Sequence, residues 1–198
     1  MRVLILPGNG CSNVHSSNWY GWLEKKLVKD ARIDQVILKN MPDPYRARRS
    51  KWVPFIIDEL MGGDINTNTI LVGHSSGAEA AMRICEDRKL AGLVLVSACH
   101  SDLGEPNERS SGWYPPSGGP WKWQAIRENS NGNIIMLHST DDPFIPIDEP
   151  RHVASSIGCN TVLREFHDKS HFFHPCNEIT QAVIDVLEVA LADNCDAF

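Results

Sequence analysis

The stretch Thr69-Ile70-Leu71-Val72-Gly73-His74-Ser75-Ser76-Gly77-Ala78 predicts a strand, a very tight turn and a helix in immediate succession. Its first four residues are apolar or have high β-propensity, and small, helix-favouring residues follow from Ala78 to Glu86. The turn fits the pattern G-x-S-x-G, in which the chain lifts a serine clear of the sheet and glycines avoid steric clashes. We therefore take Ser75 as a candidate nucleophile and interpret His74 as a packing residue.

The composition is that of an ordinary α/β domain. The chain has 198 residues and a formal net charge of −6, without a basic run, so binding to nucleic acid or to an anionic membrane is not expected. No apolar run approaches the length of a membrane span, and the apolar segment 3–6 is too short for a signal peptide. We expect a cytoplasmic protein.

The cysteines are widely separated and form no C-x-x-C pair, which favours reduced thiols over a disulfide framework or a metal site. They are Cys11, Cys85, Cys99, Cys159, Cys176 and Cys195. The loop after the first predicted strand, Pro7-Gly8-Asn9-Gly10, lacks both the spacing G-x-G-x-x-G and a P-loop lysine. We therefore expect no nucleotide, no metal and no other cofactor.

Apolar segments alternate with amphipathic ones about six times along the chain. Strands are predicted at residues 3–6, 35–38, 69–72, 91–97, 133–137 and 161–166, and helices at 18–30, 52–61, 78–88, 121–129, 147–157 and 177–192. This alternation predicts an α/β fold in which helices cover both faces of an about six-stranded, mainly parallel sheet, in a single domain spanning residues 1–198. Active sites in such sheets lie beyond the carboxyl ends of the strands.

A segment at about 99–123 differs from the rest, because it is rich in Gly, Pro, Ser and charge and shows no clear period. We interpret it as a short cap over the active site. Trp113 and Tyr114 lie in its Gly- and Pro-rich part and are candidate substrate-binding residues. For Trp121 and Trp123, packing in the small core of the cap and contact with substrate are equally good interpretations. Aromatic walls favour small substrates with apolar or aromatic acyl groups.

A serine nucleophile needs a base, and the base needs an orienting carboxylate. In α/β-hydrolases these residues follow in the order Ser, acid, His, each after a strand. The loop after the fifth predicted strand holds Asp141 and Asp142, and the spacing D-x-x-ϕ-P from Asp142 favours it over its neighbour. For the base we prefer His171, which lies in the middle of its loop. The alternatives are His167 at the strand end and His174 next to the last helix.

An oxyanion intermediate needs two N–H donors. Ser76, the residue after the nucleophile, is expected to supply one of them. The other is expected from the loop after the first strand, where Asn9 and Gly10 are both candidates.

A specific set of motifs extends almost from end to end of the chain. They are Pro7-Gly8-Asn9-Gly10, Trp19-Tyr20-Gly21-Trp22, Lys39-Asn40-Met41-Pro42-Asp43-Pro44, Gly73-His74-Ser75-Ser76-Gly77-Ala78, Ser101-Asp102-Leu103-Gly104, Asn107-Glu108-Arg109, Pro120-Trp121-Lys122-Trp123, Ser139-Thr140-Asp141-Asp142-Pro143-Phe144 and His171-Phe172. With these motifs the chain resembles the retinoblastoma-binding protein nine family of small serine hydrolases. The resemblance implies a minimal α/β-hydrolase fold and a catalytic triad of Ser75, Asp142 and His171.

The chain also departs from that family. The family name comes from an L-x-C-x-E segment that binds the retinoblastoma pocket, but here the corresponding residues are Leu60-Met61-Gly62-Gly63-Asp64. Binding to the retinoblastoma protein is therefore not expected. Ser170 stands where a Gly usually precedes the catalytic His, and residues 115–119 look like additional loop length.

The sequence thus favours a serine hydrolase that cleaves a small ester or amide through an acyl-enzyme. An aromatic amino-acid amide or peptide is among the candidate substrates, so an aminopeptidase-like activity is included. The alternative is a protein-interaction module that retains a hydrolase fold and binds through exposed aromatic residues. The complete set of triad candidates favours the enzyme. A thiol enzyme using Cys11 or Cys99 is a weaker hypothesis, because neither cysteine lies in an elbow.

Overall fold

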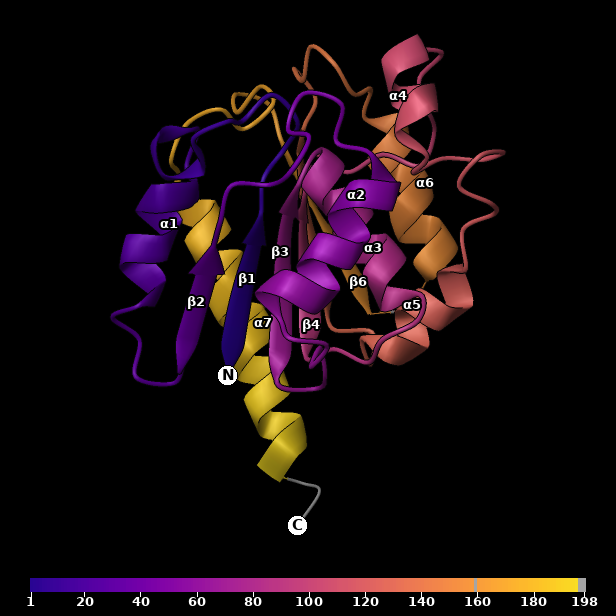
Figure 1. Ribbon diagram of the computed structural model, residues 1–198. Coiled ribbons are helices and arrows are strands. Elements are labelled where there is room, and N and C mark those ends of the chain that lie inside the picture. The colour runs from indigo at the N-terminus through magenta and orange to yellow at the C-terminus, as the bar shows by residue number, and fades with distance from the viewer. Residues whose placement is uncertain (159, 196–198) are drawn as a thin grey trace.

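The computed structural model describes residues 1–158 and 160–195 and is built around a parallel sheet (Figure 1). The strands lie in the order β2-β1-β3-β4-β5-β6, and every neighbouring pair is parallel. Their bounds are β1 Arg2–Leu6, β2 Gln35–Leu38, β3 Thr69–His74, β4 Gly92–Val96, β5 Ile134–Ser139 and β6 Thr161–Phe166. The predicted α/β fold with an about six-stranded, mainly parallel sheet is confirmed.

Helices cover both faces of the sheet (Figure 1). One face carries α1 (Tyr20–Leu27) and α7 (Asn177–Cys195), and the other carries α2 (Arg49–Pro54), α3 (Ser76–Cys85), α5 (Trp123–Asn129) and α6 (Asp148–Ile157). A 3₁₀ turn spans Val14–Ser16, a π-helical segment Phe55–Leu60 continues α2, and α4 spans Pro106–Ser111. Within residues 1–158 and 160–195, no helix is both long and apolar enough to cross a membrane.

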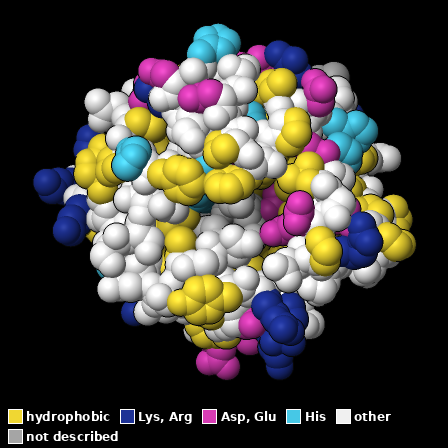
Figure 2. Space-filling model, turned by 90° about the horizontal axis from the view of Figure 1, so that it is seen from above, with side chains coloured by type: hydrophobic (Ala, Val, Ile, Leu, Met, Phe, Trp, Pro, Cys, Tyr) yellow, Lys and Arg dark blue, Asp and Glu magenta, His cyan; other side chains and the backbone are white. Residues whose placement is uncertain are grey.

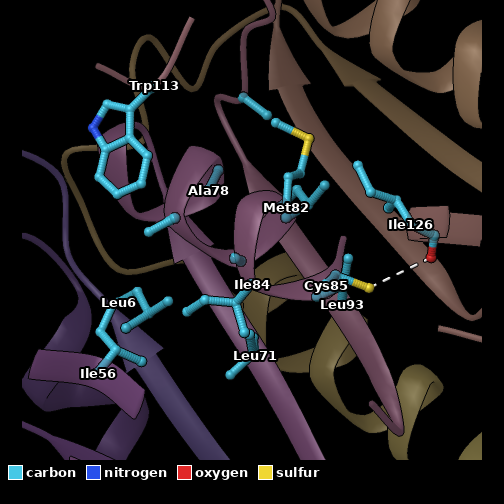
Figure 3. Close-up of a cluster of buried hydrophobic side chains, with 14 of the residues drawn as sticks. Leu6, Ile56, Leu71, Ala78, Met82, Ile84, Cys85, Leu93, Trp113 and Ile126 are labelled. Atoms are coloured by element: carbon cyan, nitrogen blue, oxygen red, sulfur yellow. Dashed lines mark hydrogen bonds between the residues drawn. The ribbon is translucent and has the colours of Figure 1, made fainter. Parts of the chain in front are cut away.

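The central strands are buried on both faces of the sheet. On each face, one hydrophobic cluster joins the sheet to the helices that cover it. Leu4 and Leu6 of β1 belong to the cluster beneath α2 and α3, whereas Val3 and Ile5 belong to the cluster beneath α1 and α7. Figure 3 shows part of the first cluster, which joins side chains of α3 to Leu6 and Leu71 of the sheet and includes the Trp113 indole. Side chains alternate between the two faces of a strand, which explains the continuous apolar runs in the sequence.

Two elements differ from the sequence-based prediction. The segment 99–120, expected to be irregular, contains α4, whose polar residues give no apolar period. The predicted helix 18–30 is shorter at both ends: Asn18 has a positive φ of 47°, and the helix begins at Tyr20. Cys11, Cys85, Cys99 and Cys176 are free thiols. Cys159 lies outside the described residues.

Candidate active site

Ser75 lies in a strained turn between β3 and α3. Its backbone has φ 51° and ψ −125°, which is a rare conformation for a residue with a side chain. Its amide N–H donates to the carbonyl oxygen of Val96 at 2.9 Å, which fixes the turn against β4. A Cβ atom on Gly77 would overlap the carbonyl oxygen of Leu6, so the close approach of α3 to β1 requires glycine. The turn therefore presents Ser75 at the carboxyl edge of the sheet.

Asp142 and His171 form a hydrogen-bonded pair next to this turn. His171 Nδ1 lies 2.8 Å from Asp142 Oδ2, and both side chains are almost fully buried. Asp142 Oδ1 accepts hydrogen bonds from the backbone N–H groups of Phe144 and Ile145 at 2.9 and 3.1 Å. Burial favours the neutral acid, but the hydrogen bond from His171, its charge and the two amides outweigh it, so the pKa of Asp142 lies below its usual range.

The neighbouring acid has a different environment. Asp141 is exposed, and its Oδ1 accepts hydrogen bonds from the Ser139 hydroxyl and from the backbone N–H of Ser170, the latter at 2.9 Å. The hydrogen bond from Ser139 is the main reason why the pKa of Asp141 is lowered. Asp141 thus ties the loop after β5 to the loop that carries His171.

The other two histidines considered as bases lie at the surface. His167 is exposed, and its Nδ1 lies 2.9 Å from the Thr140 hydroxyl. His174 is exposed as well. Neither lines the cavity at Ser75, whereas His171 does.

A cavity of about 560 Å³ opens above Ser75. Ser75, His171, Gly8 and His74 line it, together with residues from the loops that follow β4, β5 and β6. Figure 2 looks down on the carboxyl ends of the strands and shows a hollow near the centre of this face, bordered by hydrophobic and acidic side chains. Ser75 and His171 therefore line one solvent-accessible space, and Asp142 is hydrogen-bonded to His171 behind it.

The two candidate oxyanion donors of the first loop have different partners. Gly10 donates its N–H to the carbonyl oxygen of Pro44 at 2.8 Å and does not line the cavity. Asn9 lines the cavity, and within residues 1–158 and 160–195 its backbone N–H has no hydrogen-bond acceptor. Ser76 is the first residue of α3, where a backbone N–H has no partner inside the helix. Asn9 and Ser76 thus remain candidates, and Gly10 is the less suitable of the pair.

The two predicted pocket residues of the 99–123 segment lie in different places. Tyr114 lines the cavity, and its hydroxyl lies 3.2 Å from the Cys99 thiol and 3.3 Å from Glu108. Trp113 is fully buried and packs edge-on against Trp52, outside the cavity lining. The expectation that Trp113 forms a substrate wall is therefore corrected: the segment turns this indole down into the core.

Several cavity residues were not among the sequence-based candidates. Phe144, Phe173 and Tyr45 form an aromatic rim, with exposed fractions of 59%, 39% and 72%. Glu105 and Glu108 make one side acidic, and no Lys or Arg of the described chain lines the cavity. Burial raises the pKa of Glu108. The only sequence signal for Glu108 was its place in the motif Asn107-Glu108-Arg109. No characteristic distance to another motif marked it as a cavity residue.

Comparison with known proteins shows the family to which the chain belongs. The model of the family "Serine hydrolase" matches residues 3–173. The chain belongs to this serine hydrolase family. It is also 43% identical over 194 residues to serine hydrolase RBBP9 of Rattus norvegicus, covering 96% of this chain and 97% of the relative. The resemblance inferred from the sequence motifs is thereby confirmed, and the protein is a hydrolase.

Solved structures share the fold of this serine hydrolase. The crystal structure of the ydeN gene product from B. subtilis has a TM-score of 0.79 at 25% identity, covering 94% of this chain and 98% of that one. Alpha/beta hydrolase domain-containing protein 10 from mouse has a TM-score of 0.61 at 15% identity, covering 98% and 91%. This serine hydrolase therefore has an α/β-hydrolase fold.

Proposed function

We propose that this serine hydrolase cleaves small esters or amides through an acyl-enzyme on Ser75. His171 Nε2 accepts the Ser75 proton while Oγ bonds to the substrate carbonyl carbon, and Asp142 holds the imidazole with its proton on Nδ1. The N–H groups of Ser76 and Asn9 stabilise the oxyanion. Collapse of this intermediate expels the alcohol or amine, which takes the proton from His171. Water then attacks the acyl group with His171 again as base, releasing the acid and free Ser75.

One observation carries the proposal: Ser75, in its strained turn, lines the same cavity as His171, whose Nδ1 is hydrogen-bonded to Asp142. Nucleophile, base and acid in this relation are the parts that acyl transfer needs. The Cys99 thiol lines the same cavity, but burial raises the pKa of Cys99 well above its usual range and keeps this thiol neutral.

The walls of the cavity support a substrate with an aromatic group and a positive charge. Phe144, Phe173 and Tyr45 offer apolar ring surface at the mouth. Glu108 lies on the 99–123 side with its Oε1 3.1 Å from Asn9 Nδ2, which places a carboxylate near the proposed oxyanion site. A protonated α-amino group next to the scissile carbonyl would be close to such a carboxylate. We infer a preference for esters and amides of aromatic amino acids.

The experiment is a comparison of hydrolysis rates for wild type, Ser75→Ala and Ser155→Ala. Loss of the nucleophile should lower kcat by about 10⁴–10⁶-fold. Ser155 is an exposed serine of α6 whose hydroxyl donates only to its own helix, so Ser155→Ala should keep full activity. Full activity in Ser75→Ala would refute the proposal. Absence of turnover of any small ester or amide by the wild type would favour a binding module instead.

A further inference from the structure

A chain of buried hydrogen bonds runs behind the cavity and joins the two segments that flank Ser75. The backbone N–H of Gly8 donates to the Tyr20 oxygen at 2.9 Å. The Tyr20 hydroxyl and His74 Nδ1 are 2.6 Å apart, and His74 Nε2 lies 2.9 Å from the carbonyl oxygen of His171. Tyr20 and His74 are buried. These hydrogen bonds thus link the loop after β1 to the loop after β6 through His74, the residue that precedes Ser75.

The partners at each end fix the direction of every bond in this chain. The Tyr20 oxygen already accepts hydrogen bonds from Gly8 N–H and from Asn18 Nδ2, the latter at 2.9 Å, and a longer contact from the Cys11 thiol at 3.9 Å. Its own proton is therefore donated to His74 Nδ1. A neutral imidazole then carries its proton on Nε2, which donates to the His171 carbonyl. Burial, followed by the charge of nearby His171, lowers the pKa of His74 to about 3, so the ring stays neutral under ordinary conditions.

The hydrogen-bond path from Gly8 to His171 has, at each of its ends, a group that the proposed reaction uses. Gly8 precedes Asn9, which lines the cavity, and a Cβ on Gly8 would lie 3.3 Å from the Ser75 Cβ. His171 carries the imidazole paired with Asp142. Since a displacement of about 1 Å at a reacting group can cost about 100-fold in rate, holding these two segments at a fixed separation has direct consequences for catalysis.

We propose that Tyr20 and His74 are positioning residues that fix the places of the Asn9 N–H and the His171 imidazole relative to Ser75. This proposal rests on the proposed function, because it assigns those two groups their roles as oxyanion donor and base. It also revises the interpretation of His74 as a packing residue. Packing is part of its role, since its ring centroid lies 4.9 Å from that of His171, but its two nitrogen atoms carry the connection.

The hydroxyl can be separated from the packing. Trp19, Tyr20 and His74 form a cluster of rings, with centroids 4.8 Å apart for Trp19–Tyr20 and 5.8 Å apart for Tyr20–His74. Tyr20→Phe keeps the ring contacts and removes the hydroxyl that Gly8 and His74 share. Trp19→Phe is the matched control, because Trp19 is equally buried and packs against both rings, yet its indole N–H makes no hydrogen bond within the described chain.

The test measures kcat per active site, with the active fraction counted by complete labelling with a fluorophosphonate, together with KM and Tm. For Tyr20→Phe we expect kcat to fall by about 10–100-fold while KM stays within about twofold, because a displaced oxyanion donor acts in the transition state. Trp19→Phe should lower Tm and leave kcat per active site near that of the wild type. Unchanged kcat in Tyr20→Phe, or an equal fall in Trp19→Phe, would overturn the proposal.

A second pair of variants covers the case in which Tyr20→Phe does not fold. His74→Gln supplies an amide N–H that can donate to the His171 carbonyl, whereas His74→Met supplies none. We expect His74→Gln to retain the higher kcat, and equal values would contradict the positioning role. Ser75→Ala in the same assay distinguishes a failure of the positioning role from a failure of the proposed function. If it is inactive while Tyr20→Phe is normal, the positioning role alone fails, whereas full activity in Ser75→Ala means that the proposed function fails.

Discussion

Replacement of Asp142 by Asn should nearly abolish activity, because the surroundings force the new amide into the wrong orientation. Asp142 Oδ1 accepts hydrogen bonds from the N–H groups of Phe144 and Ile145, and these donors require an oxygen. In Asp142→Asn the carbonyl oxygen must therefore take that position, and the NH₂ group must point toward His171 Nδ1. The imidazole then accepts at Nδ1 and carries its proton on Nε2, where it can no longer accept the Ser75 proton.

The expected loss is about 10⁴-fold in kcat, the scale known for an imidazole held in the wrong tautomer, which corresponds to about 5.4 kcal/mol in the activation barrier. Asp141→Asn is a matched control at the adjacent position. The Asp141 oxygen that accepts from Ser139 and Ser170 would be replaced by an amide oxygen that accepts the same bonds. We therefore expect its kcat to stay within about tenfold of wild type, because both hydrogen bonds are kept and only the negative charge of the acceptor is lost.

The assay is hydrolysis of a chromogenic ester by wild type, Asp142→Asn and Asp141→Asn, with Tm recorded for each protein. Both substitutions preserve side-chain shape, so a difference in kcat at similar Tm reports on the imidazole and not on folding. Equal losses in the two variants, or the larger loss in Asp141→Asn, would refute the reasoning about the amide orientation.

Three other residues give separate predictions. Glu108→Gln should reduce the preference for a phenylalanyl ester over the 3-phenylpropionyl ester by about 10–100-fold in kcat/KM, the value of one hydrogen bond to a charged group. Because the carboxylate is the binding form and burial raises the pKa of Glu108, the wild-type preference should disappear on acidification at a higher pH than for an exposed glutamate; a pH-independent preference would contradict this. Burial raises the pKa of Glu79 well above its usual range, so its contribution to stability is present below the unfolded-state pKa and is lost as pH rises through the folded-state pKa. Glu79→Gln should therefore have the higher Tm at alkaline pH, with the difference shrinking as pH falls, and the reverse trend in thermal denaturation would count against it. Trp113→Ala should destabilise the fold by about 3–5 kcal/mol through loss of buried packing, without changing acyl selectivity, and a selectivity change at constant Tm would return Trp113 to the pocket.

The sheet was predictable because its strands are short apolar runs between turn-forming residues. The bounds of β2 and β6 agree with the prediction, since Gln35–Leu38 and Thr161–Phe166 are bordered by polar residues and loops. The helix α4 was not predictable from periodicity. Pro106–Ser111 is short and polar, and it buries one residue, Ser111, so it presents no apolar stripe.

The candidate site was partly predictable for a similar reason. Ser75, Asp142 and His171 each follow a strand, and parallel strands bring their carboxyl ends to one edge of the sheet. The environment of Trp113 could not be predicted, because nothing in a Gly- and Pro-rich segment indicates which of two consecutive aromatic residues points inward. The connection of Tyr20 to His74 was also missed, since it depends on a tertiary hydrogen bond between residues far apart in the sequence.

The most direct test of the central claim is to locate the covalent adduct. The wild-type protein is treated with a fluorophosphonate, which reacts with an activated serine, and the modified residue is identified by peptide mass spectrometry. We predict a single adduct on Ser75, which is absent in Ser75→Ala and forms far more slowly in Asp142→Asn than in Asp141→Asn. An adduct on another residue, such as Ser76 or Cys99, or undiminished labelling of Ser75→Ala, would contradict the account.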